Sequence, residues 1–330
     1  MSKKRSLIFT VFVNIAIIII ILFALEAGAR IFLYFTRGAS TVGLPERTQQ
    51  LNYKPFVMFG PDWGKVLAPA KYPGSEKGKG VYKILLLGGS TAAGFPTDIL
   101  EDAFHGQFPE RKFRVINAAE SGYNARQELI VCSVWGIGAK PDMIITLDGA
   151  NDFIHRIRMK GPGTFFLDNA YRLALTRPFL SPFLYIMRRS QLVHGLFRLK
   201  ERGAIGSVEA YSDAVPVYIS AEHSINVIAG GLDAKRIMVL QPFMSFKEPL
   251  SEGEAGFTPY KYREQVMIGL YNLADRKLRA LAELDNVIYL DTRPIYNGMK
   301  KTVFSDDVHF VSDEGYRILA DRIASSVSEL

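Results

Sequence analysis

One serine stands where an apolar run is expected to turn into a helix. The segment LLLGGSTAAG places Ser90 directly after Gly88 and Gly89. Two glycines permit a tight exit from a strand, and backbone amides at the start of the next helix attract an anion. The segment alone fits a nucleophile and a helix cap equally well. A phosphate-binding loop would need a lysine at the Walker position, and the G-x-S-x-G elbow fails because Ala92 replaces its second glycine.

Two further segments place a glycine or polar side chains just past an apolar run. INAAESGYN places Gly122 there, where its amide can face the same edge as Ser90. LDGAND places Gly149, Asn151 and Asp152 there. An asparagine amide is a neutral donor, so it can hold an oxyanion without protonating it. Taken singly, each segment also fits an ordinary turn.

The C-terminal segment FSDDVHFVSDEGY lets one short loop present an acid and a histidine together. Asp306 lies three residues before His309. The imidazole can accept the Ser90 proton while the carboxylate fixes its tautomer and stabilises the imidazolium. Asp307 is the alternative carboxylate. The other histidines lack such a partner: His105, His155, His194 and His223. No spacing matches a metal site, and no cofactor is indicated.

Short apolar runs alternate with longer helical patterns from Tyr82 onward. Strands are expected at 84–87, 113–116, 143–147, 237–240 and 287–290. Helices are expected near 125–137, 217–229 and 262–284, and a last helix begins at Ser312 as its N-cap. This alternation predicts an α/β fold with a parallel sheet covered on both faces. Because sites in such sheets form at the carboxyl ends of the strands, the chemical segments are expected to meet there.

The N-terminal segment from Leu7 to Leu25 has 19 residues without a charge. A helix of this length nearly spans a hydrocarbon layer of about 30 Å. Basic residues at 3–5 precede it, so the positive-inside rule places that end in the cytoplasm and the rest of the chain on the periplasmic or extracellular side. A cleaved signal peptide is the alternative, because Ala27-Gly28-Ala29 is a small-x-small site. The uncleaved anchor is favoured because the run exceeds the roughly 7–15 apolar residues of a signal peptide.

These patterns predict three parts. Residues 1–37 are expected to form a single-pass membrane anchor, residues 38–80 a stem, and residues 81–330 one catalytic domain. Residues 155–210 contain no obvious core strand and scatter arginines among aromatics, so they are expected to form a helical insertion. This composition fits a lid, a membrane-facing patch or the solvated surface of an added helical layer.

Composition narrows the function classes. The net charge of +7 comes from 40 basic and 33 acidic residues, and no basic run with interleaved aromatics indicates a nucleic-acid surface. Cys132 is the single cysteine, which excludes an intramolecular disulfide and a thiolate metal cluster. It lies in the apolar run LIVCSVW, so a buried small hydrophobe is expected.

The ordered set of Ser, Gly, Asn and Asp-x-x-His resembles the SGNH/GDSL hydrolase superfamily. The four family blocks fall on Ser90, Gly122, Asn151 and His309. The family's G-x-N-D block matches residues 149–152, and its D-x-x-H block matches residues 306–309. The first block often reads Gly-Asp-Ser, whereas this chain has Gly-Gly-Ser at 88–90, which resembles a known variant. The resemblance covers roughly Lys83 to the C-terminus.

This resemblance implies a three-layer α/β/α sandwich around a five-stranded parallel sheet of flavodoxin-like type. It implies an oxyanion hole made by the Ser90 amide, the Gly122 amide and the Asn151 side chain, beside a triad of Ser90, His309 and Asp306. The layout also looks like a bacterial subgroup with one N-terminal membrane helix. That subgroup has a Glu-x-x-x-Arg pair and a Gln-Pro pair, here Glu26 with Arg30 and Gln241 with Pro242.

Together these features predict a membrane-anchored serine esterase that hydrolyses acyl esters, with acetyl esters on envelope glycans or lipids as the expected substrates. The substrate class is inferred only from the expected location of the chain and from the family resemblance. Two alternatives belong to other function classes. The first is an acyltransferase that uses the same triad on a polysaccharide hydroxyl. The second is a non-catalytic glycan-binding or assembly protein with the same fold.

Overall fold

The computed structural model describes residues 13–28, 31, 53–54, 56–67, 80–158, 206–256 and 264–330. The chain divides into two compact units, one of residues 1–51 and 169–204, the other of residues 52–168 and 205–330. In the first unit, residues 13–28 are helical and mostly exposed. Within the described ranges, no helix has the length and apolar character that crossing a membrane requires. The expected segment Leu7–Leu25 begins outside these ranges.

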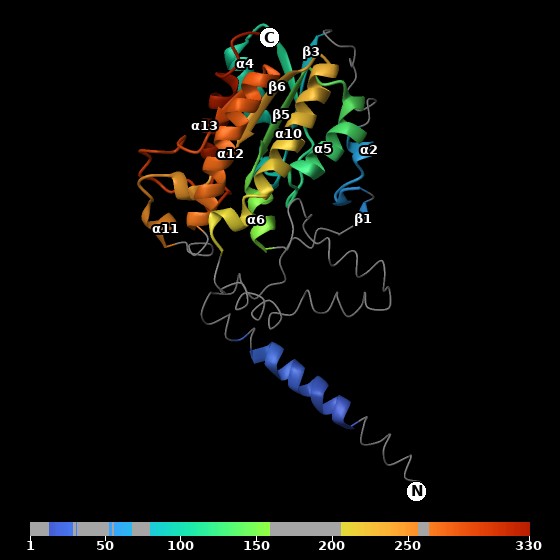
Figure 1. Ribbon diagram of the computed structural model, residues 1–330, viewed down its shortest axis with the longest axis vertical. Coiled ribbons are helices and arrows are strands. Elements are labelled where there is room, and N and C mark those ends of the chain that lie inside the picture. The colour runs from blue at the N-terminus through green and yellow to red at the C-terminus, as the bar shows by residue number, and fades with distance from the viewer. Residues whose placement is uncertain are drawn as a thin grey trace. The chain divides into compact units, whose positions relative to one another are not determined.

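The second unit is built on a five-stranded parallel sheet (Figure 1). Its strands are β3 (Val81–Gly88), β4 (Lys112–Asn117), β5 (Met143–Asp148), β6 (Lys235–Leu240) and β7 (Ile288–Asp291). Their order is β4-β3-β5-β6-β7, and every neighbouring pair is parallel. The predicted α/β fold and its flavodoxin-like strand order are confirmed. The order reverses between β3 and β5, where such sheets place their ligands.

Helices cover both faces of the sheet. On one face, α4 (Thr97–Gln107) and α13 (Asp313–Ala324) pack against the sheet through a core that includes Leu100, Phe104 and Leu319. On the other, α5 (Ala125–Val134), α10 (Ala214–Gly231) and α12 (Glu264–Asp285) enclose a second core. The central strands β3 and β5 therefore read as continuous apolar runs rather than alternating ones.

The ends of the central strands turn sharply because glycine stands there. Gly88 has φ 154°, and a Cβ on it would lie 2.4 Å from both the Leu147 carbonyl oxygen and the Ala92 Cβ. No side chain fits so close to the neighbouring strand. The Gly88 conformation starts the tight exit that delivers Ser90 to the edge of the sheet.

Several helices differ from those expected in their bounds, and others were not expected. The helix expected near 125–137 ends at Val134 and is followed by the 3-10 turn η3 (Gly136–Ala139). Ser312 is the N-cap residue of α13, but its side chain makes no capping hydrogen bond. Helix α4 was not predicted, and the helix expected to start at Ser90 is the single turn α3 (Ser90–Ala93). Most of the expected 155–210 insertion lies outside the described residues.

Part of the expected stem packs against the sheet unit. Residues 53–54 and 56–67 contain β1 (Tyr53–Lys54) and β2 (Met58–Phe59), which pair antiparallel, followed by α2 (Trp63–Val66). The Gln127 side chain donates to the Val57 carbonyl at 2.8 Å, and the Tyr123 hydroxyl donates to the Phe59 carbonyl at 2.5 Å. These residues thereby support the loop that follows β4.

Candidate active site

Ser90 is the first residue of α3, directly after the glycine exit from β3. Its side chain is half-buried, and its amide, at the helix start, has no intrahelical acceptor. Helix α3 is held in the fold by Thr91, which is fully buried. A hydroxyl at this point faces the carboxyl edge of the sheet, where the sequence predicted it.

Asn151 lies against the backbone that precedes Ser90. It belongs to α6 (Ala150–Arg158), which begins just past β5. Its side-chain nitrogen would be 2.3 Å from a Cβ placed on Gly89, so only glycine fits there. The same nitrogen donates to the Tyr123 carbonyl at 2.7 Å. One of its two N–H groups is used in this bond, and the second is left to donate elsewhere.

Gly122 lies in a turn that is tied to both of these segments. The turn is closed by the Tyr123 amide, which donates to the Glu120 carbonyl at 3.0 Å. The Glu120 amide donates to the Gly88 carbonyl at 3.1 Å, next to Ser90. Gly122 itself has φ 86°, a left-handed conformation that favours glycine. The three predicted oxyanion donors are thus held at neighbouring strand ends.

His309 is presented by a tight loop of residues 303–311, which we call the His309 loop. The Val311 amide donates to the Val303 carbonyl at 2.9 Å, and Phe304 pairs with Phe310 in a β-bridge. At the tip, the Asp306 carboxylate meets His309 Nδ1 at 2.6 Å. The same carboxylate accepts the His309 amide at 2.8 Å. With Nδ1 as donor, Nε2 of the imidazole is left to accept a proton.

The pKa of Asp306 is lowered below its usual range. Burial opposes this shift, but the hydrogen bond from the His309 side chain and the amides of Val308 and His309 outweigh it. The carboxylate therefore stays ionised beside the imidazole and can stabilise an imidazolium. The predicted pairing of Asp306 with His309 is present. The alternative, Asp307, instead uses its backbone carbonyl to accept the Met244 amide at 2.9 Å.

The His309 loop docks directly onto the residue that follows Ser90. The Thr91 hydroxyl donates to the Val308 carbonyl at 3.1 Å, although the two residues are 217 positions apart. The nucleophile candidate Ser90 and the base candidate His309 therefore each lie next in sequence to a residue of this hydrogen bond. Among the described residues, no hydrogen bond joins the Ser90 hydroxyl to His309. Such bonds often form only when substrate is bound.

A buried ion pair holds the base of the His309 loop. Glu254 accepts the amides of Val303 and Phe304 at 2.8 and 3.0 Å. Its second oxygen meets the Lys247 ammonium at 2.6 Å, and both side chains are at most 1% exposed. Burial opposes ionisation, but the Lys247 bond and three backbone amides lower the pKa of Glu254 to about 2. The loop is therefore fixed to the core at both its base and its tip.

Four buried carboxyl groups lie behind the end of β5, and we call them the carboxylate cluster. They are Glu128, Asp148, Asp152 and Glu222, each at most 5% exposed. Arg236 pairs with Glu222 at 2.6 Å and neutralises it. No set of three or more His, Cys, Asp or Glu in the described part of the chain is arranged to hold a metal ion.

Protons neutralise much of the remaining cluster. Burial, followed by the Asp152 charge, raises the pKa of Glu128 well above its usual value. Burial and the charges of Glu222 and Glu128 do the same for Asp148, whose Oδ1 also accepts the Tyr218 hydroxyl at 2.7 Å. Burial raises the pKa of Asp152 to about 7. Glu128 and Asp148 therefore add little negative charge behind Asn151 at neutral pH, whereas Asp152 is partly ionised there.

Replacing Glu128 with glutamine is expected to flatten the pH dependence of stability. The folded-state pKa lies above the unfolded value, so the native state holds the extra proton, and this contribution to stability is lost as pH rises from about 4 through the raised pKa. Urea unfolding measured from about pH 5 upward should show stability that falls less steeply with rising pH in Glu128→Gln than in wild type. Glu283→Gln, on the exposed side of α12, is the control. An unchanged slope in Glu128→Gln would contradict the raised pKa.

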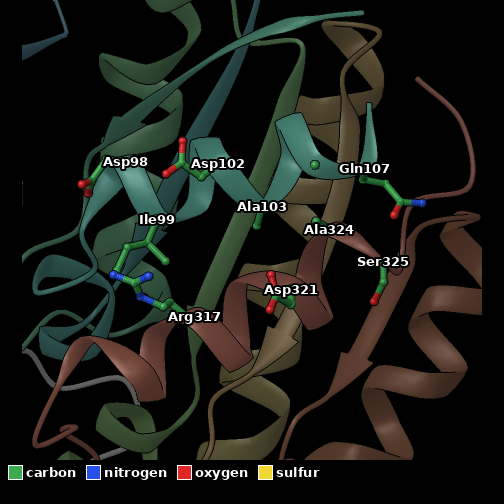
Figure 2. Close-up of a pocket in the computed structure, with 10 residues that line it drawn as sticks. Asp98, Ile99, Asp102, Ala103, Gln107, Arg317, Asp321, Ala324 and Ser325 are labelled. Atoms are coloured by element: carbon green, nitrogen blue, oxygen red, sulfur yellow. The ribbon is translucent and has the colours of Figure 1, made fainter. Parts of the chain in front are cut away.

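A cavity among the described residues lies away from these groups. It has a volume of about 570 Å³ and lies between α4 and α13. Figure 2 shows Asp98 and Asp102 of α4, and Arg317 and Asp321 of α13, around it. None of the predicted site residues lines it. The candidate active site therefore lies at the carboxyl ends of the strands and not in this cavity.

Sequence reasoning missed the residues that hold the site together. The sequence patterns singled out none of Thr91, Glu254 and Glu128. Gln241 was noted only through a resemblance. A signal was present for Glu254, because a Ser-x-x-Glu capping box at 251–254 marks a helix start. Nothing in the spacing shows that its carboxylate reaches residues 303 and 304.

The chain matches no protein-family model and no curated protein sequence. Among solved structures, it is similar to Axe2, an acetylxylan esterase from Geobacillus stearothermophilus, with 18% identity and a TM-score of 0.44 over 76% of this chain and 95% of that one. It is similar to the acetyl xylan esterase AlAXEase, with 14% identity and a TM-score of 0.46 over 74% and 99% of the two chains. LAE5, an alpha/beta hydrolase from the metagenome of Lake Arreo, Spain, has 15% identity and a TM-score of 0.45 over 74% and 94%. Sequence identities and TM-scores this low do not indicate a function, so the function is inferred from the geometry of the site.

Proposed function

We propose that this protein is a serine esterase of the SGNH/GDSL type, with Ser90 as nucleophile, His309 as general base and Asp306 as its partner. The observation that carries the proposal is the Thr91–Val308 hydrogen bond, because it ties the residue after Ser90 to the residue before His309. The 2.6 Å bond between Asp306 and His309 Nδ1 supports it, since it leaves Nε2 free to act as a base.

The reaction proceeds in two acyl-transfer steps. Ser90 Oγ attacks the ester carbonyl while His309 takes its proton, and a tetrahedral oxyanion forms. His309 then protonates the leaving alcohol, and an acyl-serine remains. Water, deprotonated by His309, attacks this ester and releases the acid and the free Ser90 hydroxyl. Asp306 stays ionised throughout and stabilises the imidazolium.

The oxyanion is held by the amides of Ser90 and Gly122 and by the Asn151 side chain. These donors are preorganised, because Asn151 is fixed by the Tyr123 carbonyl and the Gly122 turn by the Gly88 carbonyl. Fixed donors lower the transition-state energy without reorganisation. The raised pKa values of Glu128 and Asp148 help, since they reduce the negative charge behind Asn151 that would repel the oxyanion.

Replacing Asn151 with alanine is expected to lower kcat by about 10²–10³, with little change in KM, because the donor acts on charge that develops in the transition state. Hydrolysis of p-nitrophenyl acetate measures both constants. Affinity for a boronic acid, which forms a tetrahedral adduct with serine, should fall in parallel. Asn272→Ala, on the exposed side of α12, is the control. A raised KM with normal kcat would assign Asn151 to ground-state binding instead.

The substrates we propose are acyl esters of envelope glycans or lipids, acetyl esters first. The test is acetate release from O-acetylated polysaccharide by the full-length chain, with and without a non-acetylated acceptor glycan. Acetate release that the acceptor does not change supports the esterase. Acetyl groups appearing on the acceptor would show an acyltransferase. Binding of the polysaccharide with neither product would show a binding protein.

The N-terminal segment is proposed to anchor the chain in a membrane with residues 38–330 outside the cytoplasm. Its support is the uncharged run of 7–25 after three basic residues. Described side chains of this run are exposed, with Ile20 at 66% and Phe23 at 73%. The chain should stay in the membrane pellet after carbonate extraction and keep its N-terminal residues by intact mass. A mature N-terminus just after Ala29 would overturn the anchor.

A further inference from the structure

A chain of hydrogen bonds runs from the end of β6 to the His309 loop through Thr91. The Gln241 side-chain nitrogen donates to Thr91 Oγ1 at 2.9 Å. Thr91 Oγ1 donates to the Val308 carbonyl at 3.1 Å. Gln241 is 3% exposed and Thr91 is fully buried. The Gln241–Thr91 bond is therefore shielded from water, and the Thr91–Val308 bond runs from a buried donor to the half-buried Val308.

The donor–acceptor direction of these two hydrogen bonds is fixed by the side-chain amide of Gln241. A hydroxyl has one proton to donate and lone pairs to accept. Because Gln241 supplies a donor, the Thr91 proton is left for the Val308 carbonyl. A group that could only accept at position 241 would draw that proton away, and the Val308 carbonyl would lose its partner.

The chain also connects the other parts of the site. The backbone N–H of Gln241 donates to the backbone carbonyl of Asp148 at 2.9 Å, three residues before Asn151. The Tyr316 hydroxyl donates to the Thr91 carbonyl at 3.4 Å from α13, the helix that follows the His309 loop. The strand end that carries Ser90, the strand end that carries Asn151 and the His309 loop thus share one set of bonds.

We propose that Thr91 and Gln241 are positioning residues that set the distance from the Ser90 hydroxyl to His309 Nε2. This inference rests on the proposed function and adds to it. Neither residue is expected to touch substrate, because both side chains are buried. They act by holding the loop that carries the base against the helix that carries the nucleophile. A displacement of about 1 Å between reacting groups can cost about 100-fold in rate.

Two variants of Thr91 test the proposal in p-nitrophenyl acetate hydrolysis by the full-length chain. Thr91→Val keeps the shape and removes the hydroxyl, and kcat should fall about 10- to 100-fold with KM nearly unchanged. Thr91→Ser keeps the hydroxyl and should restore kcat to within about threefold. Active sites are counted with a fluorophosphonate, so kcat is expressed per folded site. A purely structural role would lower the melting temperature without changing this kcat.

Variants of Gln241 decide the matter if Thr91→Val does not fold. Gln241→Glu should lower kcat as Thr91→Val does, since its carboxylate accepts the Thr91 proton, and Gln241→Met should lower it less, since the hydroxyl stays free to donate to Val308. Normal kcat in Thr91→Val, or in both Gln241 variants, would overturn the positioning role while Ser90-dependent hydrolysis stands. Hydrolysis that Ser90→Ala leaves unchanged would overturn the proposed function and this inference with it.

Discussion

Ser90→Ala is expected to lower kcat for p-nitrophenyl acetate by a factor on the order of 10⁶. Alanine removes the only atom that forms the acyl-enzyme, and the oxyanion donors and binding contacts alone supply the residual rate. The half-buried Ser90 hydroxyl makes none of the described hydrogen bonds that hold the fold, so the melting temperature should stay within a few degrees. Steady-state rates and thermal unfolding measure the two expectations.

Ser121→Ala is the matched control for this change. Ser121 lies in the loop after β4, at the same edge of the sheet and half-buried like Ser90. Its loss should leave kcat within about twofold, because the reaction uses the amide of the neighbouring Gly122 and not the Ser121 hydroxyl. Equal activity in wild type and Ser90→Ala, or loss of activity in Ser121→Ala alone, would assign the nucleophile elsewhere.

His309→Ala is expected to reduce kcat almost as much as Ser90→Ala, because serine and histidine act as one unit. In such units the effects are not additive, and the double variant Ser90→Ala/His309→Ala should be no slower than either single one. Added imidazole should restore part of the rate in His309→Ala but none in Ser90→Ala, since a base is useless without the nucleophile. Initial rates over a series of imidazole concentrations measure this difference.

The chain offers a second histidine–carboxylate pair as the control. His223 Nδ1 meets Asp285 at 2.8 Å, between α10 and α12 and away from the strand ends. His223→Ala removes an imidazole in the same kind of pair, so it should leave kcat near the wild-type value. A loss in His223→Ala equal to that in His309→Ala would show that the histidine effect is structural. Additive losses in the double variant would show that Ser90 and His309 work separately.

Alternation of apolar runs and helical patterns was sufficient to predict the sheet. The runs of β3, β5 and β6 are apolar enough to be strands buried on both faces, whereas the edge strands β4 and β7 are only partly buried. The positions of all five runs fall within one or two residues of β3 to β7, except that β3 begins earlier, at Val81. Helix α4 was missed although its sequence is amphipathic, with Ile99, Leu100 and Phe104 buried and Asp98 and Asp102 exposed. The helix expected at Ser90 is the single turn α3.

The site was predictable wherever a residue type carries its own chemistry. Asp306 and His309 lie three residues apart, so a tight loop brings them together, and the 2.6 Å bond follows from local geometry. Thr91, Gln241 and Glu254 carry no such mark. Their partners lie 217, 150 and about 50 residues away, and only the folded chain brings them into contact.

The carboxylate cluster could not be predicted for a related reason. Glu128 and Glu222 are helical residues whose charges suggest exposed positions, and Asp148 precedes a turn. Their burial depends on how α5 and α10 pack against β5, and their protonation depends on each other. A sequence counts such groups as charges, whereas the folded chain keeps part of them neutral.

Covalent labelling tests most directly whether these distant segments form one catalytic centre. The folded full-length chain is treated with a fluorophosphonate, and the adduct is located by intact mass and peptide mapping. We expect one adduct, on Ser90, that does not form when the chain is denatured before treatment and that forms much more slowly in His309→Ala. No adduct on the folded chain, or an adduct on another residue at the same rate in both variants, would contradict it.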